Sequence, residues 1–280
     1  MRPAPPSAAS PIAETIDLVL PLAVKNNAHD DVERCRMLLE SLALRFDPRS
    51  LGTVFLVVQA GFADHVEGRL RELRLPLRVL DEREVVGETS ISGWRKQQLI
   101  KLAIAERTTE FYLCLDADVL CRRPVGYRDL VPDGRARVGA WSKRIFPDWY
   151  RASAETLGVA SDDALPAIGV TPQMLCRDVV ALLARHLERR HRRPWREVLG
   201  RSEAWTEYCL YGLVLEHYGL FDLFHVWGDL SGGDVWKLDD FHGWSAVRDA
   251  PGFFSVVQSN TGLSPEAVRA RLPPTFFTEA

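Results

Sequence analysis

Two aspartates one residue apart, Asp116 and Asp118, directly follow the apolar run from Phe111 to Leu115. On an extended chain, residues i and i+2 project to the same side, so both carboxylates can reach one hard divalent cation or its water ligands. At neutral pH the two negative charges repel each other unless solvent or a metal ion compensates them. The pair therefore predicts a cation site, and the alternative interpretation is a strand end with two solvated aspartates.

Charged and amide side chains flank this pair on both sides. The stretch from Gly93 to Leu102 has the pattern of a helix that brings Lys101, Gln97 and Gln98 near the same strand. Downstream, the stretch from Cys121 to Pro124 ends the region with two arginines and a turn residue. These cations are candidates for holding an anion, and the alternative for each is a solvated surface position.

The segment from Trp94 to Pro124 resembles the GT-A-type glycosyltransferases of bacterial surface-glycan synthesis. The pattern of that family is a lysine-bearing helix, an apolar strand, a D-x-D triplet and an exit with arginine and proline. The resemblance implies a nucleotide-sugar donor and a Mn²⁺ or Mg²⁺ ion held by Asp118. It also implies that Asp116 contacts the ion or the donor's ribose or sugar.

The same resemblance implies further donor and metal contacts. Lys25 and Asp31 lie just past the first apolar run, where this fold receives the nucleotide base, although a helix N-cap is the alternative for Asp31. The expected donor-binding residues are Lys25, Asp31, Gln97, Lys101 and Asp116. His225 is the expected third metal ligand beside Asp116 and Asp118, and the alternative is a structural histidine. The competitors for this third position are His242, Gln258 and Ser259.

An inverting enzyme of this type needs a general base near the acceptor, and Glu207 is the first candidate. It matches the family's acidic residue at a helix start, because Thr206 can cap the following helix and leave Glu207 facing the cleft. The helix dipole alone also favours a glutamate in a first turn. Asp240, together with Asp239, is the reserve candidate for a catalytic role.

The expected acceptor is a glycan or a lipid-linked glycan. Residues 169–172 are candidates for the pocket lining, and aromatic faces that stack on sugars come from Trp205, Trp227, Trp236 and Trp244. Between Arg185 and Arg196, six arginines and two histidines predict peripheral contact with an anionic membrane that presents a lipid-linked acceptor. The alternative for this segment is a solvated helix face.

Two other classes of function fit parts of the sequence. Asp116 and the residues that follow it also resemble the first motif of haloacid-dehalogenase-type phosphatases, with Asp116 as the nucleophile. Three strand–helix units precede Asp116, whereas that nucleophile normally ends the first strand, and no lysine lies between Lys143 and Lys237 to bind phosphate. A non-catalytic sugar-binding module would keep the cleft without needing Glu207.

Alternating strands and helices must position these residues. The expected strands of the first half are 16–24, 53–58, 77–80 and 111–115, and the expected helices are 32–46, 61–73 and 93–107. This order predicts an α/β fold, GT-A-like and doubly wound, with a mostly parallel, mixed sheet flanked by helices. In the second half the expected strands are 137–141, 167–171, 223–227 and 253–258, and the expected helices are 172–192 and 206–218.

The composition is that of an ordinary folded protein. The chain has 280 residues, 46% apolar and 26% charged, with a net charge of -3, which argues against disorder and against a nucleic-acid binder. No apolar run reaches the roughly 18 residues of a membrane-spanning helix. Five widely spaced cysteines without a C-x-x-C pair predict reduced thiols and a cytoplasmic protein, with at most peripheral contact at the inner face of the membrane.

The chain is expected to form a single domain behind a short leader. Residues 1–13, rich in proline, alanine and serine, are the expected disordered leader. Residues 14–280 are the expected catalytic domain, with a nucleotide-sugar-binding half at 14–125 and an acceptor half at 126–280.

Overall fold

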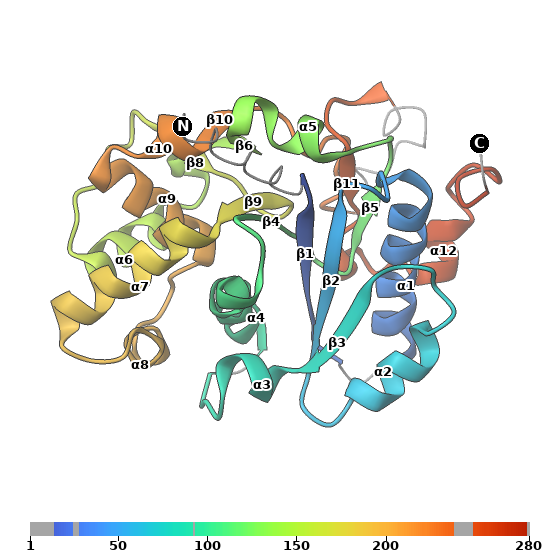
Figure 1. The fold of residues 1–280 in the computed structure, drawn as a ribbon, viewed down its shortest axis with the longest axis horizontal. Helices are drawn as coiled ribbons and strands as arrows, with labels where there is room; N and C mark the ends of the chain where they lie inside the picture. The colour runs from blue at the N-terminus through green and yellow to red at the C-terminus, as the bar shows by residue number, and fades with distance from the viewer. Residues whose placement is uncertain (1–13, 25–27, 92, 238–248, 279–280) are drawn as a thin grey trace, which may run out of the picture.

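A five-stranded mixed sheet lies at the centre of the computed structural model, which describes residues 14–24, 28–91, 93–237 and 249–278 (Figure 1). The strands, in their order across the sheet, are β3 (Leu77–Asp81), β2 (Leu51–Val58), β1 (Ile16–Leu22), β4 (Phe111–Cys114) and β9 (Gln173–Cys176). The first four are parallel, and β9 is antiparallel to β4. Every residue of β1 and β4 is buried, as expected for parallel strands covered on both faces.

Helices cover both faces of this sheet. Figure 1 shows α1 and α2 on one side, α4 on the other, and α6 to α9 in a helical lobe beside β4 and β9. The helices are α1 (Ala28–Arg45), α2 (Ala63–Leu70), α3 (Glu82–Val86), α4 (Gly93–Ala103), α5 (Tyr127–Leu130), α6 (Pro147–Leu157), α7 (Arg177–His191), α8 (Trp195–Arg201), α9 (Glu207–Tyr218), α10 (Phe221–Phe224) and α12 (Pro265–Arg269). The predicted α/β class with a mostly parallel, mixed sheet is confirmed.

Short strand pairs lie outside the central sheet. The pairs are β6 (Ala136–Val138) with β10 (His225–Trp227), β7 (Ala140–Ser142) with β8 (Pro166–Ile168), and β5 (Val119–Cys121) with β11 (Phe254–Val256). The expected helix at 172–192 is wrong over its first residues, because Gln173–Cys176 form β9 and the helix begins at Arg177. The edge of β4 that does not face β1 has backbone N–H and C=O groups that need hydrogen-bond partners. Residues 173–176 supply these partners as a strand, although their local sequence pattern predicts a helix. The expected strand at 223–227 likewise begins two residues later, after α10.

The carboxyl-terminal segment returns to the first half of the chain. β11 pairs antiparallel with β5, directly after the aspartate pair. Arg122 donates to the carbonyl of Phe254 at 3.0 Å and Arg123 donates to that of Ala250 at 2.7 Å. These two arginines hold backbone carbonyls of the returning segment, so the expectation that they supply charge to a phosphate does not fit their positions.

The five cysteines are buried and form no disulfide, in agreement with the predicted reduced state. Burial raises the pKa of Cys35 and of Cys121 to about 12, so both thiols stay protonated. They act as small apolar side chains of the core.

Candidate active site

Asp116 and Asp118 lie where two cavities meet, at the carboxyl end of β4. One cavity of about 500 Å³ is lined by α4, α6, α9 and the β7–β8 pair, and we call it the aromatic cavity. The other, of about 590 Å³, lies at the carboxyl end of β1, and we call it the polar cavity. The residues that line both are Trp94, Asp116, Asp118 and Gln258. A ligand that reaches from one cavity into the other therefore passes the two carboxylates.

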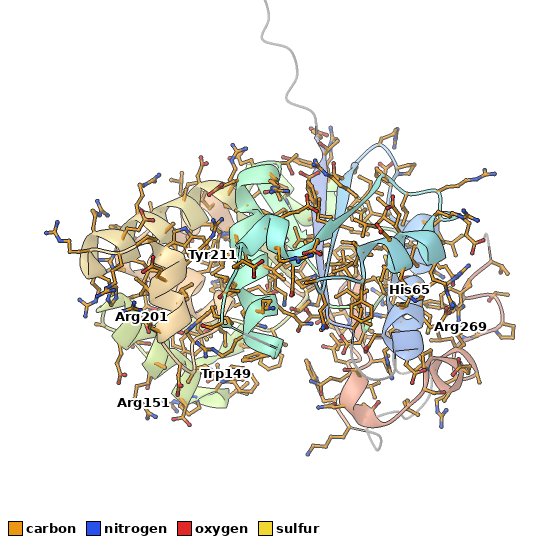
Figure 2. The ribbon with its side chains drawn as sticks, turned by 90° about the horizontal axis from the view of Figure 1, so that it is seen from below. His65, Trp149, Arg151, Arg201, Tyr211 and Arg269 are labelled. Carbon is orange, nitrogen blue, oxygen red and sulfur yellow. The ribbon has the colours of Figure 1, made fainter. Side chains whose placement is uncertain are left out.

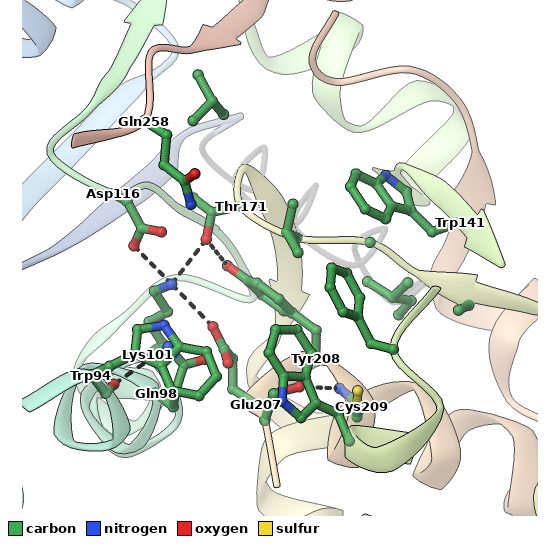
Figure 3. Close-up of a pocket in the computed structure, with 18 of the residues that line it drawn as sticks. Trp94, Gln98, Lys101, Asp116, Trp141, Thr171, Glu207, Tyr208, Cys209 and Gln258 are labelled. Carbon is green, nitrogen blue, oxygen red and sulfur yellow. Dashed lines mark hydrogen bonds and ion pairs between the residues drawn. The ribbon is translucent and has the colours of Figure 1, made fainter. Parts of the chain in front are cut away.

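Lys101 is a buried cation in the wall of the aromatic cavity (Figure 3). Its Nζ lies 2.8 Å from Asp116 Oδ1, 3.0 Å from Glu207 Oε1 and 2.9 Å from the hydroxyl of Thr171. Burial lowers the pKa of Lys101, but the two carboxylates outweigh burial and raise it well above its usual value. The charged ammonium thus ties α4 to the end of β4 and to the start of α9.

Glu207 is the first residue of α9 and lies in the wall of the aromatic cavity. The predicted cap is present, since Thr206 Oγ1 accepts a hydrogen bond from the Cys209 N–H at 3.1 Å. The side chain of Glu207 is only 1% exposed, and burial raises its pKa against the lowering effect of Lys101. Both polar atoms of the Gln98 amide have hydrogen-bond partners when its nitrogen donates to Glu207 Oε1 at 2.8 Å and its oxygen accepts from Trp94 Nε1 at 3.0 Å. Glu207 is therefore held rigidly by two partners.

Asp118 is held from the other side by the returning carboxyl-terminal segment. The Ser259 N–H donates to Asp118 Oδ2 at 2.9 Å, and the Val257 N–H donates to the Asp118 carbonyl at 2.8 Å. Burial and repulsion from Asp116 raise the pKa of Asp118 to about 6. A cation bound beside the two carboxylates would relieve that repulsion.

The oxygen donors at this point fit Mn²⁺ or Mg²⁺. Two carboxylates and the amide oxygen of Gln258 are hard ligands on the shared cavity wall. Within the described ranges, no group of three or more His, Cys, Asp or Glu side chains could hold a metal ion. Magnesium-type ions take one or two carboxylates and fill their remaining positions with water and substrate phosphate oxygens. The site therefore suits an ion that shares its ligands with a bound phosphate compound.

In the absence of metal, Asp118→Asn should stabilise the protein near neutral pH. A carboxyl whose pKa is raised in the folded state costs stability progressively as pH rises from about 4, its unfolded value, through about 6. Because the side chain is only partly buried, we expect a gain of about 1 kcal/mol at pH 7.5 and none at pH 4. Urea unfolding at the two pH values in the presence of a chelator measures this difference. An equal effect at both values would contradict the assigned pKa.

The polar cavity contains three of the expected donor-binding residues, one of which is Asp116 of the shared wall. Asp31 and Gln97 line it, together with Arg34 and Gln59. Asp31 is not the N-cap of α1, because this helix begins at Ala28 and places Asp31 in its first turn. Lys25 lies outside the described residues, as do the reserve candidates Asp239 and Asp240 and the competitors His242 and Trp244.

His225 is not brought to the aspartate pair. Its Nε2 shares a hydrogen bond of 2.6 Å with the Tyr211 hydroxyl, and its Nδ1 lies 3.1 Å from the Ala136 carbonyl. Burial lowers its pKa to about 4, and it lines neither cavity. The expected ligand role does not fit this position, and the alternative of a satisfied core histidine does. Of its competitors, Gln258 lines both cavities and Ser259 contacts Asp118 through its backbone.

The aromatic cavity includes residues that sequence reasoning missed. Gly169, Val170, Thr171 and Trp236 line it as expected, but Trp94, Trp141, Phe146 and Trp149 also do. For the last three the signal was the cluster of aromatic residues between 141 and 150, in which Phe146, Trp149 and Tyr150 have the i, i+3, i+4 spacing of one helix face. Trp205 is instead buried with its Nε1 donating to the Leu199 carbonyl, and Trp227 lines a separate cavity.

Comparison with known proteins places the chain in a family. Residues 13–280 match the model of a family of unknown function, DUF6492. The chain belongs to DUF6492. No curated protein matches it. Among solved structures, mouse xyloside xylosyltransferase 1 in its apo form is similar, with a TM-score of 0.54 and 14% identity over 88% of this chain and 99% of the mouse chain. This likeness confirms that the DUF6492 chain has the predicted GT-A-like fold.

Some side chains of the basic segment at the end of α7 make hydrogen bonds within the helical lobe of this DUF6492 protein. His186 lies 2.8 Å from the Leu157 carbonyl, His191 lies 2.7 Å from the Thr156 carbonyl, and Arg189 donates to the Tyr218 hydroxyl at 3.2 Å. The remaining exposed arginines of the segment are Arg185, Arg190, Arg192 and Arg193. Membrane contact through them stays a prediction. Of the helices described, none is long and apolar enough to cross a bilayer.

Proposed function

We propose that this protein is a metal-dependent glycosyltransferase that moves a sugar from a nucleotide-sugar donor to an acceptor hydroxyl. The observation that carries the proposal is the position of Asp116 and Asp118 at the junction of a polar and an aromatic cavity. The GT-A-like fold supports the reaction class, and the similar mouse protein is a xylosyltransferase. A role in bacterial surface-glycan synthesis is proposed from the resemblance of residues 94–124.

In this proposal each cavity binds a different substrate. The nucleotide would occupy the polar cavity near Asp31 and Gln97, and the acceptor would enter the aromatic cavity beside Glu207. The diphosphate would then lie at the junction, next to Asp116 and Asp118. A divalent ion bound there would neutralise the charge that develops on the departing diphosphate.

The side chains of this chain would supply positioning and proton transfer. A bond forms between the acceptor oxygen and the anomeric carbon, while the bond from that carbon to the diphosphate oxygen breaks and its electron pair leaves with the diphosphate. Glu207 would take the acceptor's hydroxyl proton on a carboxylate oxygen, as the general base. Lys101 would keep Asp116 and Glu207 at fixed positions on the two sides of this reaction centre.

Glu207→Gln should lower kcat by about 10²-fold, the usual scale for loss of a general base. Gln98 and Lys101 can both still bond the amide oxygen, so metal-linked binding of a nucleoside diphosphate should stay unchanged. Initial rates and a nucleotide titration on the same preparation separate these two effects. A full-rate variant would show that Glu207 is structural and that the reaction uses another base or none.

A thermal-shift experiment tests the function itself. The wild-type protein should be stabilised by uridine or guanosine diphosphate in the presence of Mn²⁺ and much less by either alone. Release of nucleoside diphosphate from a panel of nucleotide sugars then identifies the donor. Turnover of an aryl phosphate that Asp116→Asn abolishes would favour the phosphatase alternative, which the GT-A-like fold does not support. Sugar binding without any nucleotide effect would favour a binding module.

A further inference from the structure

Five partly exposed aromatic rings line the aromatic cavity, and we call them the aromatic row: Trp94, Trp149, Phe146, Trp141 and Trp236. Successive ring centroids are 5.4 Å apart for Trp94 and Trp149, 4.2 Å for Trp149 and Phe146, 5.9 Å for Phe146 and Trp141, and 6.1 Å for Trp141 and Trp236. Figure 2 shows Trp149 in the helical lobe, at the end of the molecule away from His65 and Arg269. The rings therefore form one contiguous cluster along the cavity, in which Phe146 stacks on Trp149 and Trp236 lies edge-on to Trp141.

The row is not ordinary core packing. Trp94 is 48% exposed, and the other four rings are partly exposed, although each is large enough to gain much from complete burial. Trp141 lies against the backbone of Gly169, where an added Cβ would clash with the indole. Glycine at position 169 therefore allows the Trp141 ring to pack directly against the backbone. Large aromatic side chains left partly exposed beside a cavity indicate a ligand with an apolar face.

The charges around the cavity restrict that ligand further. Its lining contains three carboxylates, from Asp116, Asp118 and Glu207. Among the lining residues that the structure describes, Lys101 is the one basic side chain, and it is already paired with Asp116 and Glu207. The proposed divalent ion would be engaged by the aspartate pair and the donor diphosphate, so an acceptor phosphate or uronic acid beside Glu207 would meet that carboxylate with no unpaired basic side chain among the described lining residues. A neutral ligand with one apolar face and several hydroxyls fits better.

A polar chain connects the row to the aspartate pair. When the Gln98 amide is oriented so that its oxygen accepts from Trp94 Nε1, its nitrogen donates to Glu207. Glu207 in turn pairs with Lys101, which also pairs with Asp116 (Figure 3). A ring stacked near Trp94 and Trp149 would therefore lie beside the carboxylate that the proposed reaction uses as its base. Stacking and proton removal would act on the same molecule.

We infer that the acceptor is a neutral glycan whose sugar ring stacks on the aromatic row, with one hydroxyl directed to Glu207. This inference rests on the proposed transferase function and narrows its acceptor class. The cavity of about 500 Å³ is within the ~300–1,000 Å³ range of small-ligand sites. The row distinguishes a glycan from a bare lipid phosphate, because a phosphate has no face to stack.

An array of neutral oligosaccharides, printed beside uronic-acid-bearing and phosphorylated ones, tests the inference with the full-length protein. Binding is measured with and without Mn²⁺ and uridine or guanosine diphosphate. At least one neutral oligosaccharide should bind, and Trp149→Ala should weaken that binding about tenfold or more while leaving metal-linked nucleotide stabilisation intact. Trp195→Ala is the matched control, because Trp195 is a partly buried tryptophan of α8 that lines neither cavity.

The outcomes separate this inference from the proposed function. Metal-linked nucleotide binding without any neutral glycan, or with acidic glycans alone, would overturn the neutral acceptor and leave the transferase in place. If glycan binding depends on Trp149 and the protein shows no metal-linked nucleotide binding, the aromatic row is a glycan-binding site and the proposed transferase function is wrong. If Trp149→Ala does not fold, Trp141→Ala takes its place, because Trp141 belongs to the row and lines the aromatic cavity but not the polar one. Unchanged glycan affinity in a folded variant would contradict the role of the row.

Discussion

Asp118→Asn should lower the rate of sugar transfer by about 10³-fold and abolish the stabilisation by Mn²⁺ with a nucleoside diphosphate. Asp118 is the carboxylate of the pair without a lysine partner, since Lys101 Nζ contacts Asp116. Both aspartates line the two cavities, so the one that does not pair with Lys101 is the better placed ligand for an ion that binds beside a diphosphate. The asparagine can still accept the hydrogen bond from Ser259, and the fold should therefore persist.

Thermal shift and donor turnover measure this effect on one preparation. Asp64→Asn is the matched control, because Asp64 is an exposed aspartate in the first turn of α2, remote from both cavities. The control should keep full nucleotide binding and full rate. An Asp118 variant with wild-type nucleotide affinity in Mn²⁺ would refute the assigned role, whatever its stability.

Lys101→Met should destabilise the protein by about 3 kcal/mol near pH 8, the scale for removing one partner of a buried ion pair. The side chains of Lys101 and Glu207 are each 1% exposed, so the glutamate would be left as a buried, uncompensated charge. Lys101 normally lowers the pKa of Glu207, and without it that pKa rises further. A carboxyl with a raised folded pKa is costly at high pH and harmless once protonated, so the loss should be smaller at pH 5 than at pH 8.

Lys96→Met on the same helix is the matched control for Lys101. Lys96 Nζ pairs with Glu82 at 2.8 Å, but both side chains remain partly accessible, and we expect a loss of about 1 kcal/mol or less. Urea unfolding of both variants and of the wild-type protein at pH 5 and pH 8 gives the four losses in the free energy of unfolding that this comparison needs. Equal, pH-independent losses in the two variants would mean that the Lys101–Glu207 pair does not carry a buried charge.

Local sequence patterns were sufficient to predict the strands of the first half of the fold and the acidic residues at the centre of the site. The apolar runs that became β1, β2 and β4 are buried on both faces, which makes them continuous in sequence and easy to recognise. Asp116 and Asp118 could be placed at the sheet rim because they directly follow such a run. The Thr206 cap and Glu207 were likewise readable, because capping acts within one helical turn.

Tertiary structure decided what depends on partners distant in the chain. Gln173–Cys176 became a strand because the edge of β4 needed pairing, and no local signal carries that information. His225 became a core residue because Tyr211 and the Ala136 carbonyl satisfy both of its ring nitrogens. Lys101 was expected near the aspartates, but its contact with Glu207, 106 positions later, follows only from the packing of α4 against α9.

The sequence alone thus determined the fold class and the acidic pair, since burial on both strand faces and the i, i+2 alternation are local properties. The assembly of one aromatic cavity from Trp94 of α4, Trp141 of β7 and Trp149 of α6 was decided only by the tertiary structure. These rings come from separate elements, and their distances are fixed by how the helical lobe packs beside the sheet. The acceptor side of the site is therefore a product of long-range packing, whereas its acidic centre is a product of local sequence.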